Sequence, residues 1–237
     1  MERRDFIRVC TSLGACAPLA GVLAPAWSAD NATLRIYSRA KLVDPAGAPL
    51  RARQVPIERN LVFNYPYAST PCFLLNLGKP TKTTARLRTA DNRWYEWPGG
   101  VGADRSIVAY SAICAHQLAY PTREISFISY RAEASLGNRF AHVIHCCSEH
   151  SQYDPAQGGR VVAGPAPQAL ASIVLEHDAT SDELYAVGTL GGEMFNQFFA
   201  KYDFRLSMEQ GRTAHDRVAG TCKVERLENY CRQQVRC

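Results

Sequence analysis

The sequence predicts an all-β protein, an antiparallel β-sandwich that ends in a short helical tail. Short apolar runs rich in β-branched and aromatic residues recur at strand spacing, with Pro, Gly and Asp turns between them. Two Cys/His pairs follow predicted strands, and phenylalanines at helical spacing appear only after residue 193. The chain has 237 residues, which is enough for one domain with a sizeable core plus extensions.

The predicted strands include residues 61–63, 72–75, 106–113, 125–130, 142–144, 172–176 and 184–188. The last two are expected to close the domain as a hairpin, because the turn-forming stretch from Asp178 to Asp182 separates them. Cys72 lies inside an apolar run, so we expect a buried free thiol there. The aromatic run from Trp94 to Trp97 is expected to serve core or loop packing rather than a partner surface.

The first Cys/His pair is Cys114 and His116, and the second is Cys147 and His150. Two cysteines with two histidines would suit a tetrahedral zinc site, but zinc motifs usually pair Cys with Cys at short spacing. The same four residues are the ligand set of a centre in which two His replace two Cys on one iron of a [2Fe–2S] cluster. The spacing therefore favours iron and sulfide over zinc.

The order Cys-x-His followed by Cys-x-x-His resembles the pattern of Rieske iron–sulfur proteins. The resemblance implies a Rieske-type antiparallel β-sandwich with a cluster-binding subdomain, which holds one [2Fe–2S] cluster per chain. Cys114 and Cys147 would hold the inner iron, and His116 and His150 would hold the outer iron near the surface. Imidazole ligands make such a cluster easier to reduce, with potentials of roughly −150 to +300 mV against roughly −400 mV for all-Cys plant-type clusters.

Further residues of the second loop strengthen the resemblance. Ser151 and Tyr153 occupy the places from which Rieske proteins donate hydrogen bonds to cluster sulfurs, although both residue types also serve as ordinary turn and core residues. The run from Gly164 to Pro167 resembles the proline-rich loop that covers the cluster, although the same run alone predicts only a loop.

One ligand position stays open, because Cys146 and Cys147 are adjacent. Cys147 gives the expected spacing to His150, and an alignment without a gap puts Cys146 in its place. The loops also depart from many relatives. Ala119 and Glu149 replace the cysteines that join the two loops, so no disulfide between the loops is expected. Leu118 stands where many relatives have Gly, and Gln117 replaces a usual apolar residue.

Residues 1–29 predict a twin-arginine export signal. Arg3 and Arg4 precede Phe6 and Ile7, an uncharged stretch follows, and small residues before position 30 offer a cleavage site. This route carries folded proteins, which suits a cluster assembled in the cytoplasm, and it predicts a periplasmic location. The uncharged stretch is long enough to anchor the chain in a membrane, but Gly and Pro interrupt it, so a cleaved or weakly anchoring signal is favoured and membrane association through this segment stays open.

The remaining chain divides into a Rieske domain over residues 30–193 and an extension over 194–237. Phe195, Phe198 and Phe199 predict an amphipathic helix in the extension. A second helix is expected over Val224, Leu227, Cys231 and Val235. In an oxidising compartment a disulfide between Cys222 and Cys231 is one alternative for the tail.

Residues 60 to 195 resemble the small Rieske subunit of arsenite oxidase. Matching stretches run from Phe63 to Cys72, from Ser106 to Ser111 and from Ser181 to Gly188. This resemblance implies an electron-transfer subunit that is no catalyst alone. It would pass electrons from a larger molybdopterin subunit to a c-type cytochrome or similar carrier.

Other functions fit the sequence less well. The alternative is the Rieske subunit of a quinol-oxidising cytochrome bc-type complex, which needs a membrane anchor. A ring-hydroxylating oxygenase needs a further catalytic domain, and the extension is too short for one. The net charge of +5 comes from scattered basic residues and predicts no nucleic-acid partner. No Cys-x-x-Cys-His motif is present, so no c-type haem is expected in this chain.

Overall fold

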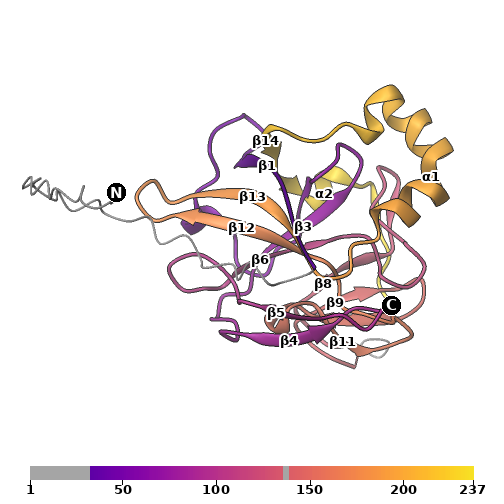
Figure 1. Cartoon of the computed structure of the whole chain (residues 1–237), viewed down its shortest axis with the longest axis horizontal. Coiled ribbons are helices and arrows are strands. Elements are labelled where there is room, and N and C mark those ends of the chain that lie inside the picture. The colour runs from indigo at the N-terminus through magenta and orange to yellow at the C-terminus, as the bar shows by residue number, and fades with distance from the viewer. Residues whose placement is uncertain (1–32, 136–138) are drawn as a thin grey trace, which may run out of the picture.

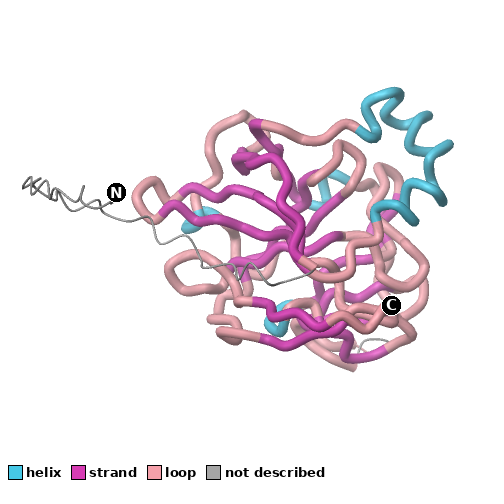
Figure 2. Tube along the Cα trace, in the orientation of Figure 1, coloured by secondary structure: helices cyan, strands magenta, loops and turns pink. Residues whose placement is uncertain are grey.

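The computed structural model describes residues 33–135 and 139–237, and it confirms the predicted all-β architecture (Figure 1). Strands make up the body of the molecule, and helix α1 (Phe195–Gln210) projects from one side (Figure 2). The largest sheet has eight strands in the order β14-β1-β13-β12-β6-β3-β2-β15. Their bounds are β1 Leu34–Val43, β2 Leu61–Asn64, β3 Pro71–Asn76, β6 Ile107–Ser111, β12 Ser172–Asp178, β13 Glu183–Leu190, β14 Gly220–Lys223 and β15 Glu225–Arg226.

The two edges of this sheet meet at Val224. Strand β14 pairs with β1 at one edge and β15 pairs with β2 at the other, and only Val224 separates β14 from β15 in the chain. The sheet therefore curls around an apolar interior instead of leaving open edges. Side chains that alternate along the strands fill this interior, among them Leu42, Phe63, Leu74 and Leu184.

A second layer carries the candidate site. Four strands lie in the order β11-β10-β9-β8, with bounds Arg160–Ala163, Ser151–Asp154, Val143–Cys146 and Ile128–Arg131. Two short pairs complete the layer, β4 (Ala85–Arg88) with β5 (Trp94–Trp97) and β7 (Ile125–Ser126) with β16 (Gln233–Gln234). A core that includes Tyr110, Ile144 and Leu170 joins this layer to the outer side of the large sheet. The predicted aromatic run lies partly in the core and partly at the surface, since Trp97 is buried and Trp94 is exposed.

The extension is integrated into the fold. The predicted first helix is α1 (Phe195–Gln210), and it buries Phe195 and Phe198. The predicted second helix is wrong for most of its length, because α2 spans only Leu227–Tyr230 and the flanking residues pair as strands β14, β15 and β16. The prediction of a Cys222–Cys231 disulfide is also wrong. Both thiols are free, because Cys222 lies inside the curled sheet and Cys231 lies in the other core.

Some expectations from the N-terminal sequence lie outside the described residues, among them the export signal over residues 1–29. Within the ranges that the structure describes, no helix has the length and apolar character needed to cross a membrane. The predicted thiol of Cys72 is free and fully buried, and it donates to the Tyr65 carbonyl oxygen at 3.0 Å. The 3-10 helices among the described residues are Ala52–Gln54, Pro155–Gln157 and Gly211–His215.

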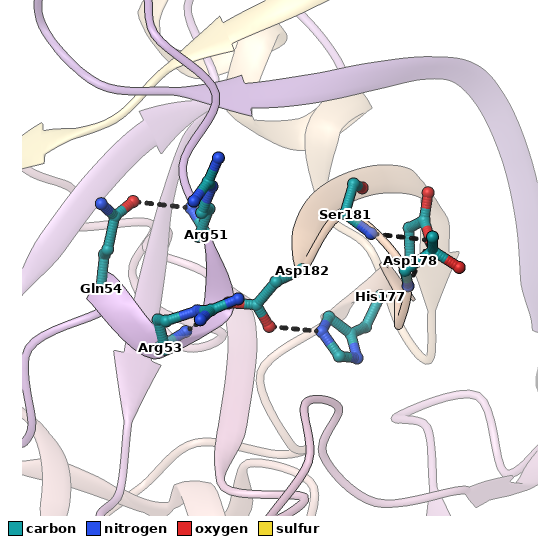
Figure 3. A network of polar contacts seen from close by, with 8 residues as sticks. Arg51, Arg53, Gln54, His177, Asp178, Ser181 and Asp182 are labelled. Atoms are coloured by element: carbon teal, nitrogen blue, oxygen red, sulfur yellow. Dashed lines mark hydrogen bonds and ion pairs between the residues drawn. The ribbon is translucent and has the colours of Figure 1, made fainter.

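The closing hairpin forms as predicted, and Figure 3 shows the polar network at its turn. Asp178 Oδ1 accepts the backbone N–H of Thr180 at 2.8 Å, which tightens the turn. Asp182 Oδ2 accepts from Arg53 Nε at 2.8 Å and from the Arg53 backbone N–H at 3.1 Å. A further hydrogen bond joins His177 Nε2 to Asp182 Oδ1 at 2.9 Å. The hairpin is therefore tied to the 3-10 helix that follows β1.

Replacing Asp182 by Asn is expected to destabilise the protein by about 1–2 kcal/mol at pH 7. Burial raises the pKa of Asp182, but the hydrogen bonds from Arg53 and His177 outweigh it and lower the pKa from 3.8 to about 2. This stabilisation is present above the ordinary pKa and is lost as the pH falls toward 2. Asn keeps the shape and tolerates the left-handed φ of 62° at this position. Urea unfolding should show the difference at pH 7 and a shrinking one below pH 4. An equal difference at both pH values would contradict the electrostatic origin.

Candidate metal centre

The first candidate loop leaves the end of β6 and turns back sharply after Cys114. The N–H of Cys114 donates to the Ala119 carbonyl oxygen at 2.8 Å, and the N–H of Leu118 donates to the Cys114 carbonyl oxygen at 3.0 Å. Leu118 has a φ of 62°, which explains physically why glycine suits this place. The Leu118 side chain is buried against Phe198 and other residues of helix α1. The tail helix thus offsets the unfavourable backbone of the first loop by packing on it.

The second candidate loop is the turn between β9 and β10. Cys146 ends β9 and pairs across the ladder with Ser151, the first residue of β10. Residues 147–150 form the turn, and His150 is exposed with a φ of 57°. The predicted proline-rich loop lies against this turn. A side chain at Gly164 would meet the His150 carbonyl oxygen and the Ser151 Cα at 2.5 Å each.

Two buried thiols face each other where the loops meet. Cys114 and Cys146 are both fully buried, and a hydrogen bond from Cys146 lowers the pKa of Cys114 while the pKa of Cys146 is raised. The hydroxyl of Tyr153 lies 3.2 Å from Cys114 Sγ and accepts the backbone N–H of Ala115 at 3.2 Å. Since that N–H occupies the hydroxyl oxygen, the Tyr153 proton is free to point at the Cys114 sulfur. Burial raises the pKa of Tyr153, so the hydroxyl keeps its proton.

The structure gives Cys147, the predicted ligand of the second loop, a sulfur partner of its own. Cys147 is joined to Cys237, the last residue of the chain, by a disulfide. A disulfide sulfur carries no thiolate and binds no iron in this state, and the thiol that faces Cys114 belongs to Cys146. The expectation that no disulfide joins the two loops agrees with the described residues. Ala119 and Glu149 stand at the places of the linking cysteines. Ala119 is partly buried and Glu149 is exposed, and the disulfide among the described residues lies elsewhere, between Cys147 and Cys237.

Two buried polar atoms near the thiol pair have no hydrogen-bond partner among the described residues. They are His116 Nδ1, two residues after Cys114, and Ser151 Oγ, across the ladder from Cys146. Leaving a buried polar atom unsatisfied costs about 1–3 kcal/mol, so such atoms in a native fold are paired with water or with a bound group. Two adjacent thiols, a ring nitrogen and a hydroxyl without partners fit a metal–sulfide cluster. The residues present therefore suit the expected cofactor.

Two further histidines flank the centre. His142 is exposed, and its Nδ1 lies 2.7 Å from Glu58 Oε1. His145 is fully buried in β9, and burial together with the neighbouring His150 lowers its pKa to about 4. The His145 ring lies 5.7 Å from the His150 ring and 3.5 Å from Cys237 Sγ. His142 thus lies at the surface, and His145 lies inside a strand. The proximity of Cys237 had no signal in the sequence, because it depends on where the tail runs.

The fold and the candidate centre define a Rieske iron–sulfur protein. The chain belongs to the family of Rieske subunits that includes iodate reductase subunit IdrB. It is 30% identical over 197 residues to IdrB of Pseudomonas sp. strain SCT, which covers 81% of this chain and 80% of that protein. It is 27% identical over 195 residues to IdrB of Denitromonas iodatirespirans, which covers 81% of this chain and 82% of that protein.

The soluble domain of the Rieske protein II from Sulfolobus acidocaldarius is 26% identical, with a TM-score of 0.45 over 66% of this chain and 82% of that chain. No family model matches the chain.

Proposed function

We propose that this chain is the Rieske electron-transfer subunit of a larger oxidoreductase, and that it holds one [2Fe–2S] cluster. The ligands would be Cys114 and Cys146 on the inner iron and His116 and His150 on the outer iron. The observation that carries this proposal is the buried pair of Cys114 and Cys146 with Tyr153 on one sulfur. The cluster would supply one reversible electron-transfer step at a potential raised by its imidazole ligands.

The burial of the four proposed ligands indicates which side of the centre a partner can reach. Cys114 and Cys146 lie in the core, whereas His116 is partly buried and His150 is exposed. The two histidines therefore form the accessible edge of the centre. The buried Leu118 follows His116 in the first loop, and Gly164 of the proline-rich loop lies against the His150 backbone, so both border this edge. A partner would exchange electrons through the imidazole rings and not through the sulfur side.

The partner follows from the relatives. IdrB is named as a subunit of iodate reductase, so a Rieske chain of this family works beside a catalytic subunit. We propose a molybdopterin subunit for this chain, and a periplasmic c-type cytochrome as the carrier. In an arsenite oxidase-like complex electrons would leave the catalytic subunit through the cluster, and in a reductase they would enter it. The names of the relatives favour this complex over a quinol-oxidising bc-type complex.

Electron paramagnetic resonance tests the cofactor directly. The protein would be purified anaerobically, reduced with dithionite and frozen, with iron and zinc measured on the same sample. A rhombic signal of a His-ligated [2Fe–2S] cluster, with iron and acid-labile sulfide in equal amounts, is the expected result. A silent sample that contains zinc and lacks iron would overturn the proposal.

Replacing Tyr153 by Phe is expected to lower the midpoint potential while the cluster is retained. The hydroxyl donates to the Cys114 sulfur, and a hydrogen bond to a ligand sulfur stabilises the reduced, more negative cluster. A differential hydrogen-bond energy of about 1.4 kcal/mol corresponds to about 60 mV for one electron. Protein-film voltammetry measures the shift. Tyr110→Phe is the control, because its buried hydroxyl donates to the Pro155 carbonyl oxygen instead. An unchanged potential in Tyr153→Phe would exclude the role of the hydroxyl.

A further inference from the structure

The last residues of the chain form a strap along the second candidate loop. Residues 232–237, called the C-terminal strap here, follow α2 and end beside β9 (Figure 1). Gln233 and Gln234 pair in parallel with Ile125 and Ser126. The backbone N–H groups of Arg232 and Val235 extend this pairing, with hydrogen bonds of 2.9 Å to the carbonyl oxygens of Arg123 and Ser126.

The strap and the second loop are held by the same segment. The N–H of Cys147 donates to the Phe127 carbonyl oxygen at 2.7 Å, directly after the residues that pair with the strap. Arg131 donates to the Val235 carbonyl oxygen, and Ser135 Oγ donates to the Cys237 carbonyl oxygen at 3.0 Å. The disulfide between Cys147 and Cys237 then joins two parts of the chain that are 90 residues apart. The strap is thus fixed along its length and covalently at its end.

The second loop has few other restraints. Ser148, Glu149 and His150 are exposed, and His150 has a backbone conformation that L-residues seldom adopt. Cys146 and Ser151 are paired with each other in the β9–β10 ladder. The turn between them, residues 147–150, is fixed covalently only by the disulfide at Cys147. Cys237 also contacts the His145 ring, which lies beside the ring of His150. A path of contacts therefore runs from the strap to the exposed candidate ligand.

We propose that the Cys147–Cys237 disulfide is a clamp that positions the second cluster loop, and His150 in particular, through the C-terminal strap. This inference rests on the proposed function, since it assigns the clamp a role toward the cluster. Cys147 and Cys237 are positioning residues and touch no iron. Among the described residues the two cluster loops share no disulfide, so the covalent restraint on the second loop comes from the end of the chain.

Removing the clamp is expected to speed the loss of iron from the folded protein. Outer-shell partners of metal ligands typically contribute a factor of 10–100 in metal affinity, so Cys237→Ser should release iron to a chelator about ten times faster or more. The electron paramagnetic resonance lines should also broaden, because His150 adopts a wider range of orientations. Cys231→Ser is the matched control, since it removes a free thiol from the same tail without touching the loop.

A double variant separates the clamp from the loss of either residue alone. Cys147→Ser, Cys237→Ser and the pair together should release iron at the same rate, because each breaks the same bond. Additive effects would overturn the clamp, and so would wild-type rates and line widths in Cys237→Ser. Alkylation and mass spectrometry of the wild-type protein as purified give a further test. Free thiols at both Cys147 and Cys237 would also overturn the clamp.

A reductant tests the clamp even where Cys237→Ser does not fold. Dithiothreitol breaks the S–S bond and is itself oxidised to a cyclic disulfide, while two electrons and two protons convert Cys147 and Cys237 to thiols. In the folded wild-type protein this treatment should speed iron release as the serine variant does. Release at the untreated rate, with both thiols alkylated, would refute the clamp. A wild-type protein without a cluster signal would instead refute the proposed function.

Discussion

Replacing Cys146 by Ser is expected to abolish the cluster, whereas Cys147→Ser is expected to assemble one. Cys146 is fully buried against Cys114, and serine offers iron a poor ligand in place of the thiolate. Cys147 is engaged with Cys237 in a disulfide. Iron and acid-labile sulfide per chain, measured directly after purification, decide between the two cysteines. Cys114→Ser should behave like Cys146→Ser.

The control for this comparison is Cys222→Ser. Cys222 is another buried free thiol, and it donates to the Asn64 carbonyl oxygen at 3.4 Å inside the curled sheet. Its replacement tests the general cost of a serine in the core without a change at the site. A full cluster in Cys146→Ser together with an empty Cys147→Ser would restore the ligand set expected from the Cys-x-x-His spacing. It would also mean that the disulfide is absent from the cluster-bound protein.

Local patterns in the sequence predicted most of the fold and three of the four proposed ligands. Alternating apolar residues and flanking turn residues identify strands in the sequence, and both features predict the hairpin between β12 and β13. Cys114, His116 and His150 stand out because short Cys/His spacings are uncommon by chance. Such patterns do not decide whether Cys146 or Cys147 is the ligand. That choice depends on the register of β9 against β10, where a shift of one residue exchanges the two faces.

The tail was predicted less well, because its structure depends on long-range pairing. The apolar spacing of Val224, Leu227 and Cys231 suits a helix, yet this segment finds unpaired strand edges on both sides of the large sheet. Backbone hydrogen bonds at those edges outweigh the weak helical preference of a few residues. The disulfide of Cys237 likewise depends on long-range pairing. Nothing local to the last residue reveals that the strap ends beside the second loop.

Replacing Gly164 by Ala is expected to displace the second loop and to lose the cluster. The added methyl group would lie 2.5 Å from the His150 carbonyl oxygen and from Ser151 Cα, and neither backbone atom can move without shifting the loop. The φ of 87° adds a cost of about 1–2 kcal/mol for any L-residue. Overpacking against backbone adds about 1–3 kcal/mol. We therefore expect about 2–5 kcal/mol of destabilisation, seen in urea unfolding and in iron content.

Gly47→Ala separates the two costs. Gly47 has the same φ of 87°, but nothing lies within 4 Å of the position that its Cβ would take. This variant should therefore show only the backbone cost of about 1–2 kcal/mol and keep its iron. The difference between the two variants measures how tightly the proline-rich loop holds His150. If Gly164→Ala lost no more stability than Gly47→Ala and kept its cluster, the proline-rich loop would not restrain the second loop. The hold on His150 would then come from the C-terminal strap alone.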